Sequence, residues 1–107
     1  MIKNLNRLQR YLVCNALNNL ELVNGGSRLY VNRLEVAEEL THVLPGRTTL
    51  LLEDAAEPQI ERAMILMEAQ SHDTWSPSAK RAWDGVWAQL KLQRPDPPLS
   101  YNFKCRY

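Results

Sequence analysis

Apolar residues recur every three or four positions near the start of the chain. This spacing is typical of one face of an α-helix, so we predict an amphipathic helix over residues 5–20. The sequence NGGS at 24–27 follows, and its two glycines favour a tight turn that ends the helix. The residues of the predicted inner face are Leu5, Leu8, Leu12, Val13, Ala16, Leu17 and Leu20.

Three later segments have the same periodicity, and each has a start signal. Asn32 precedes the first of them with Glu35 three residues later, which is a capping-box pattern. Pro58 suits the first turn of the next helix, and Ser76 with Pro77 begins the last. The predicted inner faces are Leu34, Ala37, Leu40 and Val43 or Leu44; Ile60, Ala63, Met64 and Met67; and Ala79, Ala82, Trp83, Val86, Trp87 and Leu90.

Two segments carry strand signals. RLYVN at 28–32 is rich in strand formers, and residues 99–107 alternate apolar with polar side chains. A strand needs a partner for its backbone N–H and C=O groups, so we predict that 99–107 pairs with 28–32 or with another protein. RTTLLLEDA at 47–55 is ambiguous, and we favour a short helix because no partner strand for it is evident.

Together these elements predict a mainly α protein. We expect a compact bundle of about four helices, with a small two-stranded β element that pairs 28–32 with 99–107. The length of 107 residues favours a single domain over residues 1–107. Prolines at 95, 97 and 98 exclude helix there and predict an extended C-terminal segment over 94–107.

The cysteines and the apolar runs bear on the compartment. Only Cys14 and Cys105 are present, far apart, so we predict free thiols, with a Cys14–Cys105 bridge as the alternative. The longest apolar runs, AMILM at 63–67 and LLL at 50–52, are too short to cross a bilayer. Arginines interrupt any signal-peptide core near the N-terminus. We therefore expect a cytoplasmic protein without membrane association.

Charge is distributed unevenly along the chain, although the net charge is only +1. Residues 1–33 carry five basic residues against one acid, and residues 74–107 carry six against two, so each end has a net charge of +4. Residues 34–73 carry nine acids against two arginines, a net charge of −7. Such asymmetry bears on partners and association rates rather than on the fold.

The acidic middle of the chain predicts a surface for a basic protein partner. Spaced carboxylates imitate the phosphates of a nucleic acid and can occupy the basic groove of a nucleic-acid-binding protein. Our main hypothesis is a non-catalytic inhibitor or adaptor that docks this acidic surface on such a partner. Phage-encoded inhibitors of host defence, including anti-CRISPR proteins, are often as small and as poor in motifs, so we expect a protein of that type. A solvated surface without a partner is the alternative. The partner-binding residues would be Glu35, Glu38, Glu39, Glu53, Asp54, Glu57, Glu61 and Glu68, of which Glu57, Glu61 and Glu68 form one helical stripe.

A DNA-binding regulator is the second hypothesis. Residues 32–57 have the spacing of a helix-turn-helix, with Pro-Gly at 45–46 as its corner, and both chain ends are basic. However, the second helix would present Glu53, Asp54 and Glu57 to the phosphate backbone, so we expect no tight binding of duplex DNA. The alternative basic surface comprises Arg7, Arg10, Arg28, Arg33, Lys80, Arg81, Lys104 and Arg106.

Catalytic and metal-binding signatures are weak. SHD at 71–73 contains the residue types of a hydrolase triad, but chain neighbours point in different directions and triad members come from separate elements. The cysteines and histidines at 14, 42, 72 and 105 lack zinc-site spacing, and NGGS lacks the lysine of a phosphate loop. We therefore predict no enzymatic activity, no metal site and no cofactor.

Overall fold

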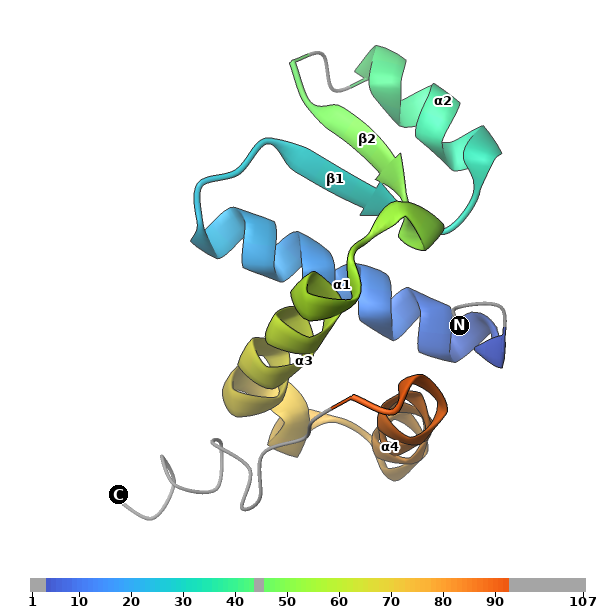
Figure 1. The fold of residues 1–107 in the computed structure, drawn as a ribbon, viewed down its shortest axis with the longest axis vertical. Helices are drawn as coiled ribbons and strands as arrows, with labels where there is room; N and C mark the ends of the chain where they lie inside the picture. The colour runs from blue at the N-terminus through green and yellow to red at the C-terminus, as the bar shows by residue number, and fades with distance from the viewer. Residues whose placement is uncertain (1–3, 44–45, 93–107) are drawn as a thin grey trace.

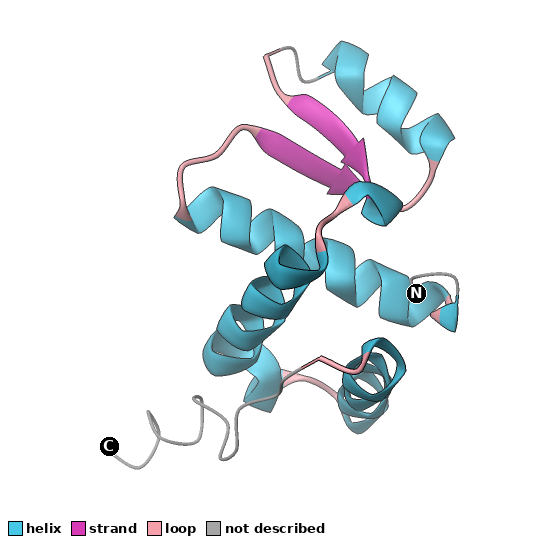
Figure 2. Ribbon diagram, in the orientation of Figure 1, coloured by secondary structure: helices cyan, strands magenta, loops and turns pink. Residues whose placement is uncertain are grey.

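The longest helix of the described residues, α1, packs against α3, α4 and β1 (Figure 1). The computed structural model describes residues 4–43 and 46–92, so the predicted segment 94–107 lies outside the described residues. The predicted mainly α fold with a small two-stranded element is confirmed (Figure 2). The elements are α1 Arg7–Val23, β1 Arg28–Val31, α2 Leu34–Val43, β2 Thr48–Leu51, the 3₁₀ turn η2 Leu52–Asp54, α3 Glu57–Ser71, the 3₁₀ turn η3 His72–Thr74 and α4 Pro77–Leu90.

A capping box fixes the N-terminus of α1. The Asn6 side chain accepts a hydrogen bond from the Gln9 backbone N–H (2.9 Å), and the Gln9 side chain accepts one from the Asn6 backbone N–H (2.9 Å). Gln9 Nε2 also donates to the Ala82 carbonyl oxygen in α4 (3.1 Å). A Cβ at Gly85 would collide with this amide. Glycine at position 85 costs about 1 kcal/mol of helix propensity relative to alanine. Because it has no Cβ, it leaves room for the hydrogen bond from Gln9 to Ala82 that joins α1 to α4.

Helices α1, α3 and α4 enclose the main hydrophobic core, in which Trp83 is fully buried. Trp75, just before α4, packs edge-on against Trp83 with ring centroids 4.9 Å apart. The predicted inner faces of these helices are largely confirmed, but Leu8 is 43% exposed and does not belong to the core. The buried apolar residues are Leu12, Val13, Cys14, Ala16, Leu17 and Leu20 of α1; Ile60, Ala63 and Met64 of α3; and Trp83, Val86, Trp87 and Leu90 of α4.

Strand β1 pairs with β2 in a parallel two-stranded sheet, with Arg28 opposite Thr48 and Val31 opposite Leu51. Strand β2 is the partner of β1 in this sheet, whereas 99–107, the segment predicted to pair with 28–32, lies outside the described residues. One prediction is wrong here, because 47–55 forms β2 and η2 instead of a helix. Parallel strands need a crossover, usually a helix, and α2 provides it. Strand β1, the partner of β2, lies before the intervening helix α2 in the sequence. The local periodicity around β2 therefore does not reveal that a partner strand exists.

The strand β2 also overturns the predicted helix-turn-helix. That motif needs a second helix after the corner, because this helix enters the DNA groove. In the structure α2 is followed by a strand and a 3₁₀ turn of three residues. Helix α2 and strand β2 therefore belong to a β–α–β unit that begins at β1, and the DNA-binding hypothesis loses the motif on which it was based.

The two faces of the sheet contact different helices. In Figure 1 the strands lie between α1 and α2. Tyr30, opposite Leu50, belongs to the main core beside α1. Val31 and Ala37 are buried outside that core, which indicates that the other face of the sheet packs against α2.

A side chain of α1 closes the outer edge of β1. The Tyr30 backbone N–H donates to Asn18 Oδ1 (2.7 Å), and Asn18 Nδ2 donates to the Tyr30 carbonyl oxygen (3.0 Å). The Asn18 amide thus takes the place of the peptide group of a third strand, and both backbone groups of Tyr30 are satisfied. A further strand could pair with β1 at this position only by displacing Asn18.

Candidate functional site

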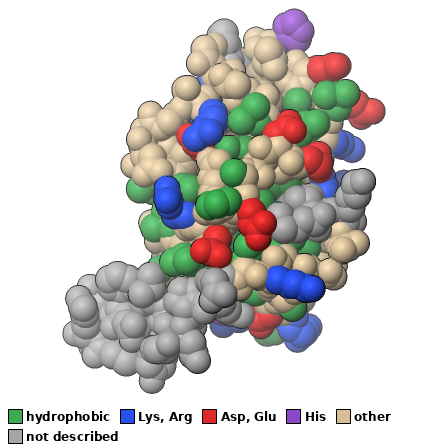
Figure 3. Space-filling view, in the orientation of Figure 1, with side chains coloured by type: hydrophobic (Ala, Val, Ile, Leu, Met, Phe, Trp, Pro, Cys, Tyr) green, Lys and Arg blue, Asp and Glu red, His purple; other side chains and the backbone are tan. Residues whose placement is uncertain are grey.

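Helix α2 presents an acidic surface to solvent. Glu35, Glu38 and Glu39 are exposed, and none of them forms an ion pair with another residue in the ranges 4–43 and 46–92. Their spacing places them on one side of the helix. Figure 3 shows acidic side chains gathered at the upper right, the region that α2 occupies in Figure 1. The predicted exposure of these three glutamates is therefore observed.

Two apolar side chains flank these acids. Leu34 and Val43, the first and last residues of α2, are 60% and 69% exposed. The predicted inner face included Leu34 and either Val43 or Leu44, so it is wrong at Leu34, while Leu44 lies outside the described residues. Only Ala37 is buried, and Val36 and Leu40 are half-buried. The reason is that α2 packs on a sheet of two strands, which covers only part of its apolar stripe. We call the exposed set Leu34, Glu35, Glu38, Glu39 and Val43 the α2 acidic face.

The other predicted acids differ in environment. Position 68 lies one helical turn after the buried Met64, so Glu68 points inward and is only 2% exposed. The predicted stripe along α3 is therefore wrong at Glu68, which cannot meet a partner from this position. The remaining members are Glu53, which binds Arg10; Asp54 and Glu57, which are exposed; and Glu61, which is half-buried.

The predicted basic residues do not form one surface either. Arg28 binds the buried carboxylate of Glu21 (2.8 Å), which also accepts a hydrogen bond from Gln59 Nε2 (3.1 Å). A Cβ at Gly26 would collide with this carboxylate, which explains the second glycine of NGGS. The other members are Arg7, Arg33 and Arg81, which are exposed; Arg10 and Lys80, which are half-buried; and Lys104 and Arg106, which lie outside the described residues.

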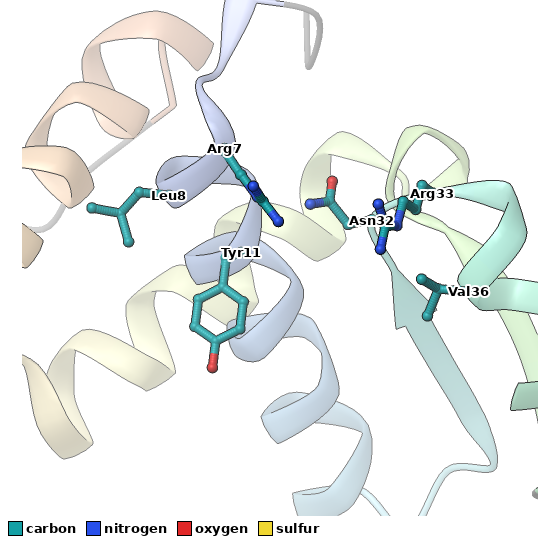
Figure 4. A pocket seen from close by; sticks show the side chains of 6 residues that line it. All are labelled: Arg7, Leu8, Tyr11, Asn32, Arg33 and Val36. Atoms are coloured by element: carbon teal, nitrogen blue, oxygen red, sulfur yellow. The ribbon is translucent and has the colours of Figure 1, made fainter.

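Sequence reasoning missed a groove of about 700 Å³ between α1 and the start of α2. Figure 4 shows Arg7 on one wall and Arg33 on the other, with Asn32 between them. Apolar side chains line much of the remaining surface, and Tyr11 is 58% exposed. The lining residues are Arg7, Leu8, Tyr11, Asn32, Arg33 and Val36.

Arg10 holds the two walls of this groove together. Its Nε donates to Asn32 Oδ1 (2.7 Å), its Nη2 donates to the Asn32 carbonyl oxygen (3.2 Å), and the same nitrogen binds Glu53. The side-chain oxygen that was predicted to cap α2 therefore accepts a hydrogen bond from α1 instead. Charge-assisted bonds of this kind are stronger than neutral ones, so the groove is a preformed feature.

The described part of the chain holds neither a metal-binding cluster nor a membrane-spanning helix. It contains no group of three or more His, Cys, Asp or Glu side chains placed to hold a metal ion. The SHD sequence does not assemble a triad, because the Ser71 hydroxyl contacts Met67 Sδ (3.4 Å) and His72 packs on Trp75 with ring centroids 5.5 Å apart. None of the helices in residues 4–43 and 46–92 has the length and apolar character needed to cross a membrane.

Cys14 is a free thiol in the core, as predicted, whereas Cys105 lies outside the described residues. Burial disfavours the charged thiolate and raises the pKa of Cys14 from 9.0 to about 11, although the nearby Arg10 partly opposes this shift. The thiol is therefore neutral in the folded protein at physiological pH, and a thiol in this state is a poor nucleophile.

We expect the pKa of Cys14 to make stability depend on pH in the alkaline range. The folded-state pKa lies above the unfolded value, so the stabilisation is complete below pH 9.0 and is lost as the pH rises through about 11. Urea unfolding across this range should show a steeper loss for the wild type than for Cys14→Ala. Identical pH dependence in the two proteins would contradict the prediction.

Two surfaces of the described residues stand out: the α2 acidic face, whose three glutamates are exposed, and the groove beside it. No family model, curated protein or solved structure matches this chain. The function must be inferred from the charge, exposure and packing of these two surfaces.

Proposed function

We propose that this protein is a non-catalytic inhibitor or adaptor that docks its α2 acidic face on a basic surface of a protein partner. The observation that carries the proposal is the exposure of Glu35, Glu38 and Glu39 without an ion pair among the described residues. Unpaired carboxylates attract a basic surface before contact and raise the association rate. Leu34 and Val43 add apolar area that contact can bury.

A nucleic-acid-binding protein is the partner class that suits this face. Its groove carries arginines and lysines placed for phosphates, and carboxylates along one side of a helix would meet the same cations. Occupation of the groove would exclude nucleic acid from it. This is the mode of action expected of a small anti-defence inhibitor encoded by a phage, such as one of the anti-CRISPR type.

Charge reversal on α2 tests the proposal. We expect wild-type protein to capture basic nucleic-acid-binding proteins from a host lysate at low salt, and to release them as salt screens the attraction. Glu35→Lys/Glu39→Lys should abolish this capture. Circular dichroism and unfolding should stay unchanged, because exposed substitutions rarely alter stability by more than about 0.5 kcal/mol.

Lys80→Glu/Arg81→Glu is the matched control, since it reverses the same number of charges on α4. The acidic-face proposal fails if this control abolishes capture while the α2 reversal leaves capture and its salt dependence unchanged. A gel shift with random duplex DNA provides a second measurement. We expect no tight complex at physiological salt, and a tight complex would support the DNA-binding regulator instead.

A further inference from the structure

We propose that the groove between α1 and α2 binds an acidic peptide segment that carries an apolar side chain. This inference goes beyond the proposed function, because it concerns a different surface and a ligand of the opposite charge. It rests on two arginines that form no ion pair within the described residues, on the exposed apolar lining and on the preformed walls of the groove.

Two arginines provide the anion-binding part of the site. Arg7 lies in the first turn of α1, and Arg33 directly precedes α2. Both are exposed, and neither forms an ion pair with another residue of the described part. A guanidinium binds a carboxylate through two parallel N–H···O bonds, so these two arginines suit carboxylates of one peptide. The N-terminus of α2 adds a favourable potential beside Arg33.

Leu8, Tyr11 and Val36 provide the apolar part of the lining (Figure 4). Leu8 and Tyr11 of α1 are largely exposed, and Val36 of α2 is half-buried. Apolar side chains that gather on a surface mark a binding site more often than scattered ones do. A volume of about 700 Å³ is that of a pocket for a peptide side chain and its neighbours, and is much larger than a single anion requires.

The walls of the groove are fixed before any ligand arrives. The hydrogen bonds from Arg10 to the Asn32 side chain and backbone join α1 to the segment that leads into α2. A ligand therefore does not have to order these elements, which lowers the entropic cost of binding. Arg10 itself is already engaged with Asn32 and Glu53, which leaves Arg7 and Arg33 for the ligand.

The surroundings favour a short acidic peptide over a nucleic acid. Two carboxylates lie near the groove. Glu35 lies two residues after Arg33 in the sequence. Glu53 binds Arg10, and Arg10 in turn donates a hydrogen bond to the lining residue Asn32. A nucleic acid carries a phosphate at every nucleotide, so its backbone would continue from the arginines towards these carboxylates. A peptide with one or two acidic residues ends within the groove and avoids this repulsion.

The test uses the full chain and a short fluorescein-labelled peptide in which two glutamates are separated and flanked by leucines. Its binding is followed by fluorescence anisotropy at low salt. We expect Arg7→Glu/Arg33→Glu to weaken binding by at least about tenfold, because two charge-assisted contacts become repulsive. A peptide with glutamine in place of glutamate, and the variant Tyr11→Ser, should also bind more weakly. Arg62→Glu/Arg81→Glu is the matched control on α3 and α4 and should bind like the wild type.

Several results would overturn the proposal. These are absence of peptide binding by the wild type, unchanged binding of the glutamine peptide, and equal weakening by Arg62→Glu/Arg81→Glu. Labelled oligothymidylate is the second probe. If it binds more tightly than the peptide and its binding is abolished in Arg7→Glu/Arg33→Glu, the groove is a nucleic-acid site. Glu35→Lys/Glu39→Lys should not weaken peptide binding, so failure of this proposal is distinguishable from failure of the proposed function.

Discussion

Replacement of Trp83 by alanine should lower the free energy of unfolding by about 3–5 kcal/mol. Trp83 is fully buried where α4 meets the main core, and its ring packs edge-on against Trp75. Alanine would leave a cavity that the surrounding helices can fill only in part. Urea unfolding followed by far-UV circular dichroism measures the change.

Tyr11→Ala is the control for this prediction, because it removes an aromatic ring that is 58% exposed. Its effect on stability should stay below about 0.5 kcal/mol. Trp83→Phe should cost much less than Trp83→Ala, since it keeps most of the ring volume and Trp83 Nε1 has no hydrogen-bond partner among the described residues. A Trp83→Ala protein that unfolds like the wild type but captures no partner would instead place Trp83 in an interface.

We expect the second large effect from Asn18→Ala, which should lower the free energy of unfolding by about 2–6 kcal/mol. The substitution removes the partners of both the N–H and the carbonyl of Tyr30. Tyr30 is buried, so water cannot readily replace them, and each unsatisfied buried group costs about 1–3 kcal/mol. Hydrogen exchange of the Tyr30 amide should accelerate together with the loss of stability.

The neighbouring residue offers a matched control. Asn19 Nδ2 donates to Gln70 Oε1 (2.8 Å) at an exposed position, so Asn19→Ala should change stability by no more than about 0.5 kcal/mol. Asn18→Asp keeps the acceptor for the Tyr30 N–H but places a second oxygen opposite the Tyr30 carbonyl oxygen, so it should also be less stable than the wild type. Equal effects of Asn18→Ala and Asn19→Ala would show that the edge of β1 does not depend on Asn18.

The α2 acidic face and the groove place opposite charges on neighbouring surfaces. Arg33 and Val36 line the groove, whereas Glu35 and Glu39 belong to the acidic face. A short helix can serve both because it packs on a narrow sheet and leaves much of its circumference open. Two such surfaces suit an adaptor or inhibitor that contacts its partner at more than one point, and the charge-reversal pairs separate their contributions.

The sequence by itself determined the helices and much of the core. α1, α3 and α4 each contain an apolar stripe at helical spacing, which predicts both the element and its inner face. The start of α4 is similarly local, since the Ser76 hydroxyl accepts a hydrogen bond from the Ala79 N–H (3.3 Å). The exposure of Glu35, Glu38 and Glu39 also follows from their place on a helix, because charge is normally solvated.

Only the tertiary structure decided the sheet, the groove and the environment of most charges. β2 is a strand because β1 lies beside it across the α2 crossover, and no nearby residue encodes that pairing. Glu68 is buried because α3 turns that position into the core. Arg10 is engaged because Asn32 and Glu53 come within hydrogen-bonding reach. Periodicity describes one element at a time, whereas a groove or an ion pair depends on the distance between elements, which only their packing sets.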